Sequence, residues 1–584
     1  MERDLQYGAA RIDRGSFVAS AISTENDSRR HGESEERLSD ACPFVGVVTP
    51  SASTAPVKKS TSALPEDVEG GALRSGEVPN LYSRRYIGLL VQYAAIGLLY
   101  GSLPRTVYPF LNNYLRMNGY QTLSARVLLS LPWSIKVLIG VVSDSFPIFG
   151  SRRRAYMVIG WLICSAMLIV LVASDQGDPF YVDRSLRGKD VSAIPKSQLQ
   201  GRINWDAPRR GALYIVMMML ASCGYMVADV ASDGLVVEFA QREPEIQRGN
   251  IQSTIYLVRS LFMILSALLV GIGMNGYDYG GSFSWSLSMG QLMLICSMLS
   301  LLAIPAAVWC INEPRLVIPV AFRVYLAQLW RLLQNGAMLQ IMAYRFTVTA
   351  GDPIQRYWAK VHPLNESLFS VLGLCVFSAA LYFTKQFGLQ WNWRRVIAST
   401  LITVLCIDAV VSALTIWDVA RSQWFWLGTP ILEELPAAMS FLVSTFVVVE
   451  MAEEGNEAAV YGLLTTISNL SSPFASCLSK NVNALFDVSV DDITRDTTHV
   501  RWQVTYTFLI AYLMKLLSLA WLGLLPRQKM ETQELKRRSS SSFVGGVAAV
   551  SIGLFALIWS IVTNLMSIFA STACLKIAGG SGCP

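Results

Sequence analysis

Two aspartates, Asp229 and Asp233, lie four residues apart inside a long apolar run. In an α-helix this spacing puts both side chains on one face. A charge in the middle of a membrane is costly unless it faces a polar cavity or a partner. Neighbouring apolar runs hold three candidate partners: Lys136, Arg105 and Arg259. We expect these carboxylates and cations to line one polar site within the membrane.

Such a site has a functional and a structural interpretation. Burial raises the pKa of a carboxyl group and a neighbouring cation lowers it, so a carboxylate held between these limits can load and release a proton. The alternative is a static network of buried ion pairs that sets the register of the helices. A second Asp on the same face favours the functional interpretation.

Further candidates for ligand binding lie in the second half of the chain. Arg345 and Asp352 are seven residues apart, and Glu433 lies in a later apolar run. An Arg can hold a carboxylate through two parallel hydrogen bonds. Aromatic side chains can stack on a flat ligand, and the candidates are Tyr93, Tyr100, Tyr108, Trp133, Tyr225 and Tyr256.

A different group of charges marks helix ends. Asp144 is followed by a turn containing Pro147 and Gly150 and then by Arg152, Arg153 and Arg154. This order resembles an element between helices 2 and 3 of the major facilitator superfamily, and the resemblance implies that these charges pin helices together in one state and release them in another. The plain alternative is anchoring of the loop by its positive charges. Two further acids, Glu238 and Glu450, end later apolar runs, and we expect them to be structural or gating residues.

The elements that carry these residues are membrane spans. Of the 584 residues, 52% are hydrophobic and 15% are charged, whereas a soluble protein has about a quarter charged residues. Apolar runs of about 20 residues, each long enough to span a bilayer, recur from Tyr86 almost to the C-terminus. The predicted spans are 86–110, 123–143, 155–174, 211–234, 250–274, 287–310, 336–356, 367–384, 396–417, 424–450, 458–482, 502–524 and 543–570.

The composition also excludes several classes of function. None of the three histidines lies in a span, so we expect no histidine-ligated metal and no cofactor. No basic stripe with interleaved aromatic residues predicts nucleic-acid binding. No phosphate-binding loop of the Walker A type is present, so export driven by ATP has no support, and we do not expect an enzyme.

The spans predict an all-α polytopic membrane protein with two six-helix halves and a thirteenth C-terminal helix. Residues 236–260 align without gaps on 448–472 with eight identities, which indicates an internal repeat. Parallel repeats of this kind are a transporter architecture, with the substrate site between the halves. The predicted parts are a disordered cytosolic region (1–83), the first half (84–311), a cytosolic connection (312–335), the second half (336–526), a basic linker (527–542), the additional helix (543–570) and a tail (571–584).

The charged segments also resemble a known family. Asp144-Ser-Phe-Pro-Ile-Phe-Gly-Ser-Arg-Arg-Arg-Ala-Tyr-Met, Pro132-Trp-Ser-Ile-Lys136 and Ala228-Asp-Val-Ala-Ser-Asp233-Gly-Leu-Val-Val-Glu238 look like segments of the folate–biopterin transporter family of the major facilitator superfamily. The resemblance covers about 86–530 and is strongest in the first six spans. It implies a symporter of pterins or folates, with protons as the coupling ion.

The leading hypothesis is therefore a secondary active transporter of pterins or folates that works by alternating access. The alternatives are a transporter of the same fold for another organic anion or small solute, and a non-transporting receptor or scaffold. Lys and Arg are more frequent in the loops on the side of the N-terminus, which favours a cytosolic N-terminus. We expect the plasma membrane rather than an organelle.

Overall fold

The computed structural model describes residues 69–568, apart from 118, 187–198, 314–321, 346–357, 360–362, 484, 487, 489–492 and 494, and also Thr572 and Leu575. The expected disordered region 1–83 lies outside the described residues as far as residue 68. From Glu69 the chain is described, beginning with a short 3-10 helix, η1 (Glu69–Gly71).

Helices of the first half follow in the order that the apolar runs predict. A helix forms where a run is long and uninterrupted; α4 has no charged residue after its first position. These helices are α1 (Ile87–Thr106), continued by the π-helix η2 (Val107–Tyr114), α2 (Gly119–Ser134), α3 (Lys136–Ser145), α4 (Arg154–Ala173), α6 (Ala207–Gln241), α7 (Asn250–Gly273) and α8 (Met289–Trp309).

The second half is helical as well. Two helices, α9 (Phe322–Gln334) and α10 (Gly336–Arg345), lead into it. It contains α11 (Pro363–Phe383), α12 (Trp393–Ile416), α13 (Gln423–Met451), α14 (Glu457–Asn483) and α16 (Thr498–Trp521), followed by α17 (Lys529–Arg538) and α18 (Phe543–Ile568). The expected all-α polytopic class is confirmed.

The number of spans in the described part of the chain is smaller than the sequence predicts. Within the described residues, 10 helices are long and apolar enough to cross a membrane. The structure describes the expected seventh span only as far as Arg345, and the side chains of α14 only as far as Leu470. The expected count of twelve spans plus one is therefore not confirmed.

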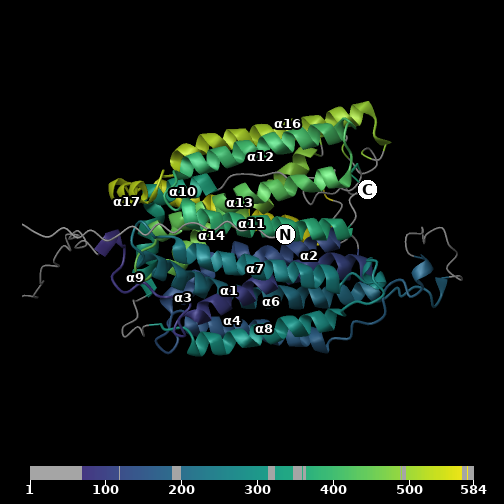
Figure 1. The fold of residues 1–584 in the computed structure, drawn as a ribbon, viewed down its shortest axis with the longest axis horizontal. Helices are drawn as coiled ribbons and strands as arrows, with labels where there is room; N and C mark the ends of the chain where they lie inside the picture. The colour runs from purple at the N-terminus through teal and green to yellow at the C-terminus, as the bar shows by residue number, and fades with distance from the viewer. Residues whose placement is uncertain are drawn as a thin grey trace, which may run out of the picture. The chain divides into compact units, whose positions relative to one another are not determined.

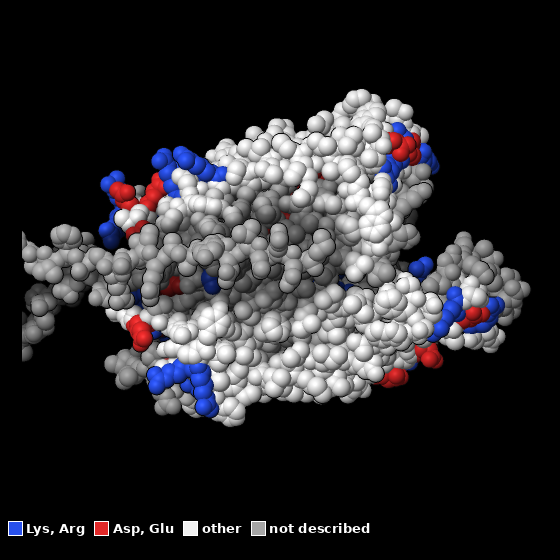
Figure 2. All heavy atoms as spheres, in the orientation of Figure 1, with Lys and Arg blue, Asp and Glu red and all other residues white. Residues whose placement is uncertain are grey.

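The two sets of helices occupy different regions of the bundle. Helices α1, α4, α6, α7 and α8 lie together in the lower part of Figure 1, and α11, α12, α13 and α16 lie in the upper part. In Figure 2 the charged side chains gather at the two ends of the helices, and the visible surface between the ends is almost uncharged. This pattern fits a belt in contact with lipid.

A break in the second span positions its lysine. Helix α2 contains Pro132, which lacks a backbone N–H, and the chain leaves helical geometry at Ile135. Helix α3 then begins at Lys136. The break therefore places this lysine at the start of a new helical segment inside the membrane-spanning run.

Helix α3 approaches α14 of the second half very closely. A Cβ atom at Gly140 would lie 2.5 Å from the carbonyl oxygen of Ala458. One at Gly462 would lie 2.9 Å from the carbonyl oxygen of Lys136. Glycine at both positions therefore lets the two halves meet backbone to backbone next to the buried lysine.

Candidate functional site

Lys136, Asp229 and Asp233 form one buried cluster, which we call the charged triad. The Nζ atom of Lys136 lies 2.5 Å from Oδ2 of Asp229 and 2.7 Å from Oδ2 of Asp233. All three side chains are at most 2% exposed. The helical spacing of the two aspartates and the break before Lys136 bring them together, as the sequence predicts for these three residues.

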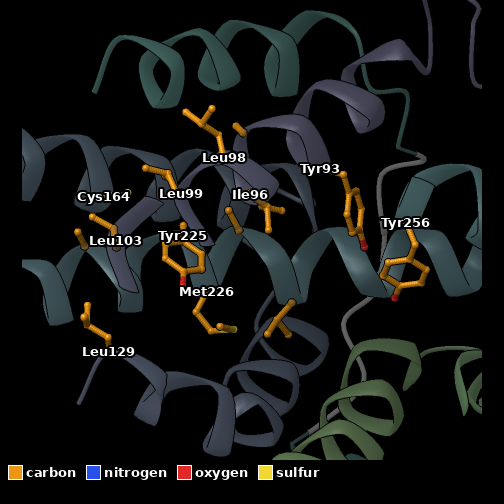
Figure 3. Close-up of a cluster of buried hydrophobic side chains, with 14 of the residues drawn as sticks. Tyr93, Ile96, Leu98, Leu99, Leu103, Leu129, Cys164, Tyr225, Met226 and Tyr256 are labelled. Carbon is orange, nitrogen blue, oxygen red and sulfur yellow. The ribbon is translucent and has the colours of Figure 1, made fainter. Parts of the chain in front are cut away.

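Aromatic side chains surround the triad. The hydroxyl group of Tyr93 donates to Oδ1 of Asp233 at 2.5 Å. The ammonium group of Lys136 lies 4.7 Å from the ring centre of Trp133 and 5.2 Å from that of Tyr461. Tyr93 and Tyr256 approach each other edge to face, at the border with the green helices of the second half (Figure 3).

Arg259 lies beside the triad, where Asp229 is its strongest electrostatic partner. Its guanidinium carbon is 4.9 Å from the ring centre of Tyr100 and 5.0 Å from that of Trp133. Within the described part of the chain it forms no ion pair. An unpaired cation between two aromatic rings can receive the anionic group of a flat ligand.

Arg105 is a second cation of this kind. It donates to the carbonyl oxygen of Gly101 in its own helix at 2.8 Å. The described residues contain no carboxylate that pairs with it. It follows Tyr100 by five residues, which is roughly 7 Å along α1. The structure therefore shows no ion pair of Arg105 or Arg259 among the described residues, whereas Lys136 contacts two carboxylates.

Residues of the second half complete the site. Tyr461 of α14 is hydrogen-bonded to Tyr256 of α7, hydroxyl to hydroxyl. The side-chain amide of Asn469 donates to the carbonyl oxygen of Trp133 at 3.2 Å. The hydroxyl group of Thr466 accepts from the backbone N–H of Val137 at 3.1 Å. The triad therefore lies where the two halves touch.

One end of the bundle is closed by ion pairs between the halves, and we call it the ion-pair end. Arg153 contacts Oδ1 of Asp144 at 2.5 Å and Oε2 of Glu457 at 3.0 Å. Oδ2 of Asp144 accepts from the backbone of Ala459 at 2.8 Å and from Tyr325 at 3.1 Å. Burial lowers the pKa of Arg153, but the adjacent carboxylates of Asp144 and Glu457 more than offset this and raise it.

The repeat-related acids lie at the same end. Glu238 pairs with Arg242 at 2.7 Å, and Glu450 pairs with Arg248 of the opposite half at 2.8 Å. Arg152 lies 3.7 Å from Glu457. Arg154 instead donates to the carbonyl oxygens of Ala307 and Val308 in α8. The predicted gating residues thus gather at one end, although the side-chain contacts described for Arg154 lie within its own half.

The segment before the first span also reaches this end. Arg74 lies 3.0 Å from Glu457, 3.0 Å from Glu454 and 3.8 Å from Glu238. The backbone N–H groups of Leu73 and Arg74 donate to the carbonyl oxygen of Gln241. Residues 69–74 therefore connect α6 of the first half with the start of α14.

Helix α17, which follows the last span of the second half, also contacts the ion-pair end. Lys529 donates to the carbonyl oxygen of Glu245 at 2.9 Å, and Gln533 donates to Oε2 of Glu450 at 2.7 Å. Lys536 donates to the carbonyl oxygen of Met451 at 3.1 Å and lies 3.2 Å from Glu453. Helix α17 thus ties the end of α13 to the turn between α6 and α7.

The remaining predicted ligands are not part of the triad. Glu433 lies in α13, with Asp408 and Lys515 of neighbouring helices as its charged surroundings. The side chain of Arg345 and all of Asp352 lie outside the described residues. Arg74, Tyr461 and Asn469 were not predicted, because each belongs to a polar or common residue type whose sequence neighbours give no indication of a distant partner.

The chain is similar in sequence to known transporters. Residues 97–178, which include Lys136, Asp144 and Arg153, match the model of the BT1 family. The "Folate-biopterin transporter" of Synechocystis is 24% identical over 423 residues, which cover 68% of this chain and 72% of that protein. The chain is therefore similar to transporters of the folate–biopterin family. It is accordingly a multi-pass membrane transporter and not an enzyme.

Two further relatives also carry transporter names. "Folate transporter 1" of Plasmodium falciparum is 20% identical over 418 residues, which cover 69% of this chain and 72% of that protein. "Probable folate-biopterin transporter 7" of Arabidopsis thaliana is 27% identical over 175 residues, 30% of this chain and 33% of that protein. Among solved structures, a mutant of the nucleoside transporter NupG is 14% identical with a TM-score of 0.42, and the match covers 76% of this chain and 100% of that one.

Proposed function

We propose that this protein is a secondary active transporter of pterins and folates, driven by protons and working by alternating access. The observation that carries the proposal is the charged triad with the guanidinium group of Arg259 beside it, at the contact between the halves of the described chain. The names of the relatives supply the substrate class.

The site suits a flat ligand with an acidic group. A pterin ring presents donors and acceptors on its edge and an aromatic face. The ring centres of Tyr100 and Trp133 lie 4.8 Å apart, and the guanidinium carbon of Arg259 lies 4.9 and 5.0 Å from them. A carboxylate of the substrate would bind Arg259, and the ring would stack on an aromatic side chain.

Charge balance links the substrate to a proton. Two carboxylates, Asp229 and Asp233, face two cations, Lys136 and Arg259, so the formal charges cancel. A substrate carboxylate that binds Arg259 adds one negative charge to a poorly solvated site. A proton on one of the aspartates restores neutrality, which makes the loaded site less costly inside the membrane.

Alternating access would use the ion-pair end as one of two gates. Asp144, Arg153 and Glu457 join the halves there, and breaking these pairs would open the site to that side. We place this end in the cytosol, with the N-terminus, and the protein in the plasma membrane. Proton-coupled symport through these states would carry substrate and proton together.

Uptake by proteoliposomes tests the proposal. Purified protein should accumulate labelled folate or biopterin when the pH is lower on the side of entry. Arg259→Gln should abolish binding of the carboxylated substrate, whereas Arg126→Gln, at an exposed position of α2, should leave it unchanged. Transport of neither compound by correctly folded protein would refute the proposal, and uptake of another organic anion would favour the first alternative.

A further inference from the structure

Four serines, Ser539 to Ser542, follow the last basic residues of α17. Among the described contacts, only one of their four hydroxyl groups has no hydrogen-bond partner. Ser539 donates to the carbonyl oxygen of Leu535, Ser541 donates to Gln334, and the hydroxyl oxygen of Ser542 accepts from Gly545. Within the described residues, the hydroxyl group of Ser540 has no hydrogen-bond partner. Ser540 is also exposed.

The residues before Ser540 are positively charged and accessible. Lys536, Arg537 and Arg538 form the last turn of α17, and both arginine side chains are exposed. In the part of the chain that the structure describes, Arg538 pairs only with Glu534 of its own helix, at 2.5 Å on the surface. The chain leaves helical geometry at Ser539. Ser540, whose hydroxyl group has no described partner, therefore follows the exposed Arg538 by two residues and Arg537 by three.

We propose that Ser540 is a phosphorylation site for a serine kinase that recognises basic residues. Acidic groups of such an enzyme would bind Arg537 and Arg538 after the last turn of α17 unwinds. The Oγ atom of Ser540 attacks the γ-phosphorus of ATP, the bond to the bridging oxygen breaks, and ADP leaves. The hydroxyl proton passes to the base of the kinase. The inference rests on the proposed cytosolic position of the ion-pair end, where ATP is present.

The modification would act on α17. A phosphate adds about 1.5 to 2 negative charges at neutral pH. At the C-terminal end of a helix this charge opposes the helix dipole. It also competes for Lys536, which holds α17 against Met451 and Glu453 of the second half. Phosphorylated Ser540 therefore loosens α17 from α13 and favours opening of the ion-pair end.

Labelling of the purified full-length protein tests the site. A basic-residue-directed kinase and ATP should phosphorylate Ser540, as located by peptide mass spectrometry. Ser540→Ala should remove this label and Ser541→Ala should retain it. Replacing both Arg537 and Arg538 by Gln should slow labelling at least tenfold. Absence of phosphate from Ser540, or equal labelling rates in the arginine variant, would overturn the assignment.

Hydrogen exchange tests the consequence without requiring transport. Peptides covering 529–538 should exchange several-fold faster after phosphorylation, and Ser540→Ala treated with the same kinase should show no change. Unchanged or slower exchange would overturn the loosening of α17. Kinase and ATP added outside intact cells should not label Ser540; labelling there would overturn its cytosolic position. All these results are independent of whether folate or biopterin is transported.

Discussion

Lys136 holds both aspartates of the triad through one ammonium group, so a change of charge on either carboxylate alters the attraction that the other experiences. The two are not equivalent. Asp233 also accepts a hydrogen bond from Tyr93, whereas Oδ1 of Asp229 has no hydrogen-bond partner among the described residues. The ammonium group of Lys136 is therefore the one described polar contact of the Asp229 carboxylate.

We predict that Asp229→Asn abolishes accumulation of substrate driven by a pH gradient but preserves exchange of substrate across the membrane. An amide cannot change its charge between the two states, and exchange requires no net movement of protons. Asp233→Asn should have a similar but weaker effect on coupling. Uptake with a pH gradient, measured beside counterflow in the same proteoliposomes, checks this.

The control for these variants is the amount of folded protein. If an aspartate is purely structural, its removal leaves Lys136 with one carboxylate fewer, and the protein misfolds or is poorly expressed. Folded variants that retain full accumulation would show that neither residue couples the proton, and Asp352, Asp408 and Glu433 would become the candidates.

A second residue-scale prediction concerns gating. Asp144→Asn weakens the contact with Arg153 and leaves the substrate site, which it does not touch, unchanged. We expect turnover to change at least threefold while the Kd of the substrate changes less than twofold. Equal effects on the two quantities would contradict a gating role.

At the scale of the elements, the contact between α3 and α14 depends on glycine. A Cβ atom at Gly140 would lie 2.5 Å from a backbone oxygen of Ala458, a distance that cannot be tolerated without movement of the helices. Gly428 in α13 has no atom within 4 Å of the corresponding position. The two glycines form a matched pair for substitution.

Gly140→Ala should destabilise the state in which the ion-pair end is closed, and Gly428→Ala should not. We expect a loss of most transport activity for the first variant only. Alkylation of a cysteine introduced at Ala459, which is buried in the closed end, should become faster in the Gly140→Ala background. Unchanged alkylation would show that the helices accommodate the methyl group.

The sequence predicts the elements better than it predicts their contacts across the halves. Charges in apolar runs are rare, so Asp229, Asp233 and Lys136 could be grouped from their types and spacing. Tyr461 and Asn469 could not, because a tyrosine or an asparagine within a helix is common and nothing in the sequence indicates a partner in the other half. Arg74 was missed because its segment is polar and has no hydrophobic period.

At the scale of the whole molecule, two distant segments contact the turn between α6 and α7. One precedes the first span, and the other follows the last span of the second half. Glu245 in this turn donates its backbone N–H to the carbonyl oxygen of Gly70 and accepts from Lys529. Glu243, in the same turn, accepts from the backbone N–H groups of Gly249 and Ile251 at 2.9 and 3.0 Å. Burial raises the pKa of Glu243 to about 7.

This pKa makes the stability of the turn depend on pH. Between the ordinary value of 4.5 and about 7, folded protein binds more protons at Glu243 than unfolded protein does, so the free energy of unfolding falls as pH rises. The change is on the order of a few kcal/mol. Lys529 and Lys385 are the cations that face this carboxyl group among the described residues.

Hydrogen exchange of residues 243–251, corrected for the intrinsic rate at each pH, should therefore become faster from pH 5 to pH 7. Glu243→Gln should flatten this dependence, because an amide does not titrate. It should also lower the stability at every pH, since its NH₂ group cannot accept from the second backbone N–H. A variant that keeps the slope of the original protein would assign the titration to another group.

Lys136 belongs to two contacts at once. Its ammonium group neutralises the triad, and its own carbonyl oxygen faces Gly462 at the place where the halves touch. In the proposed cycle, binding at the triad would therefore affect the contact between the halves through Lys136 itself, without intermediate side chains. In the proposed cycle, the triad around Lys136 would set the number of protons carried per substrate, whereas the distant ion pairs would govern only the speed. Substitutions at the ion-pair end could then change the rate of transport during evolution without changing the number of protons carried per substrate.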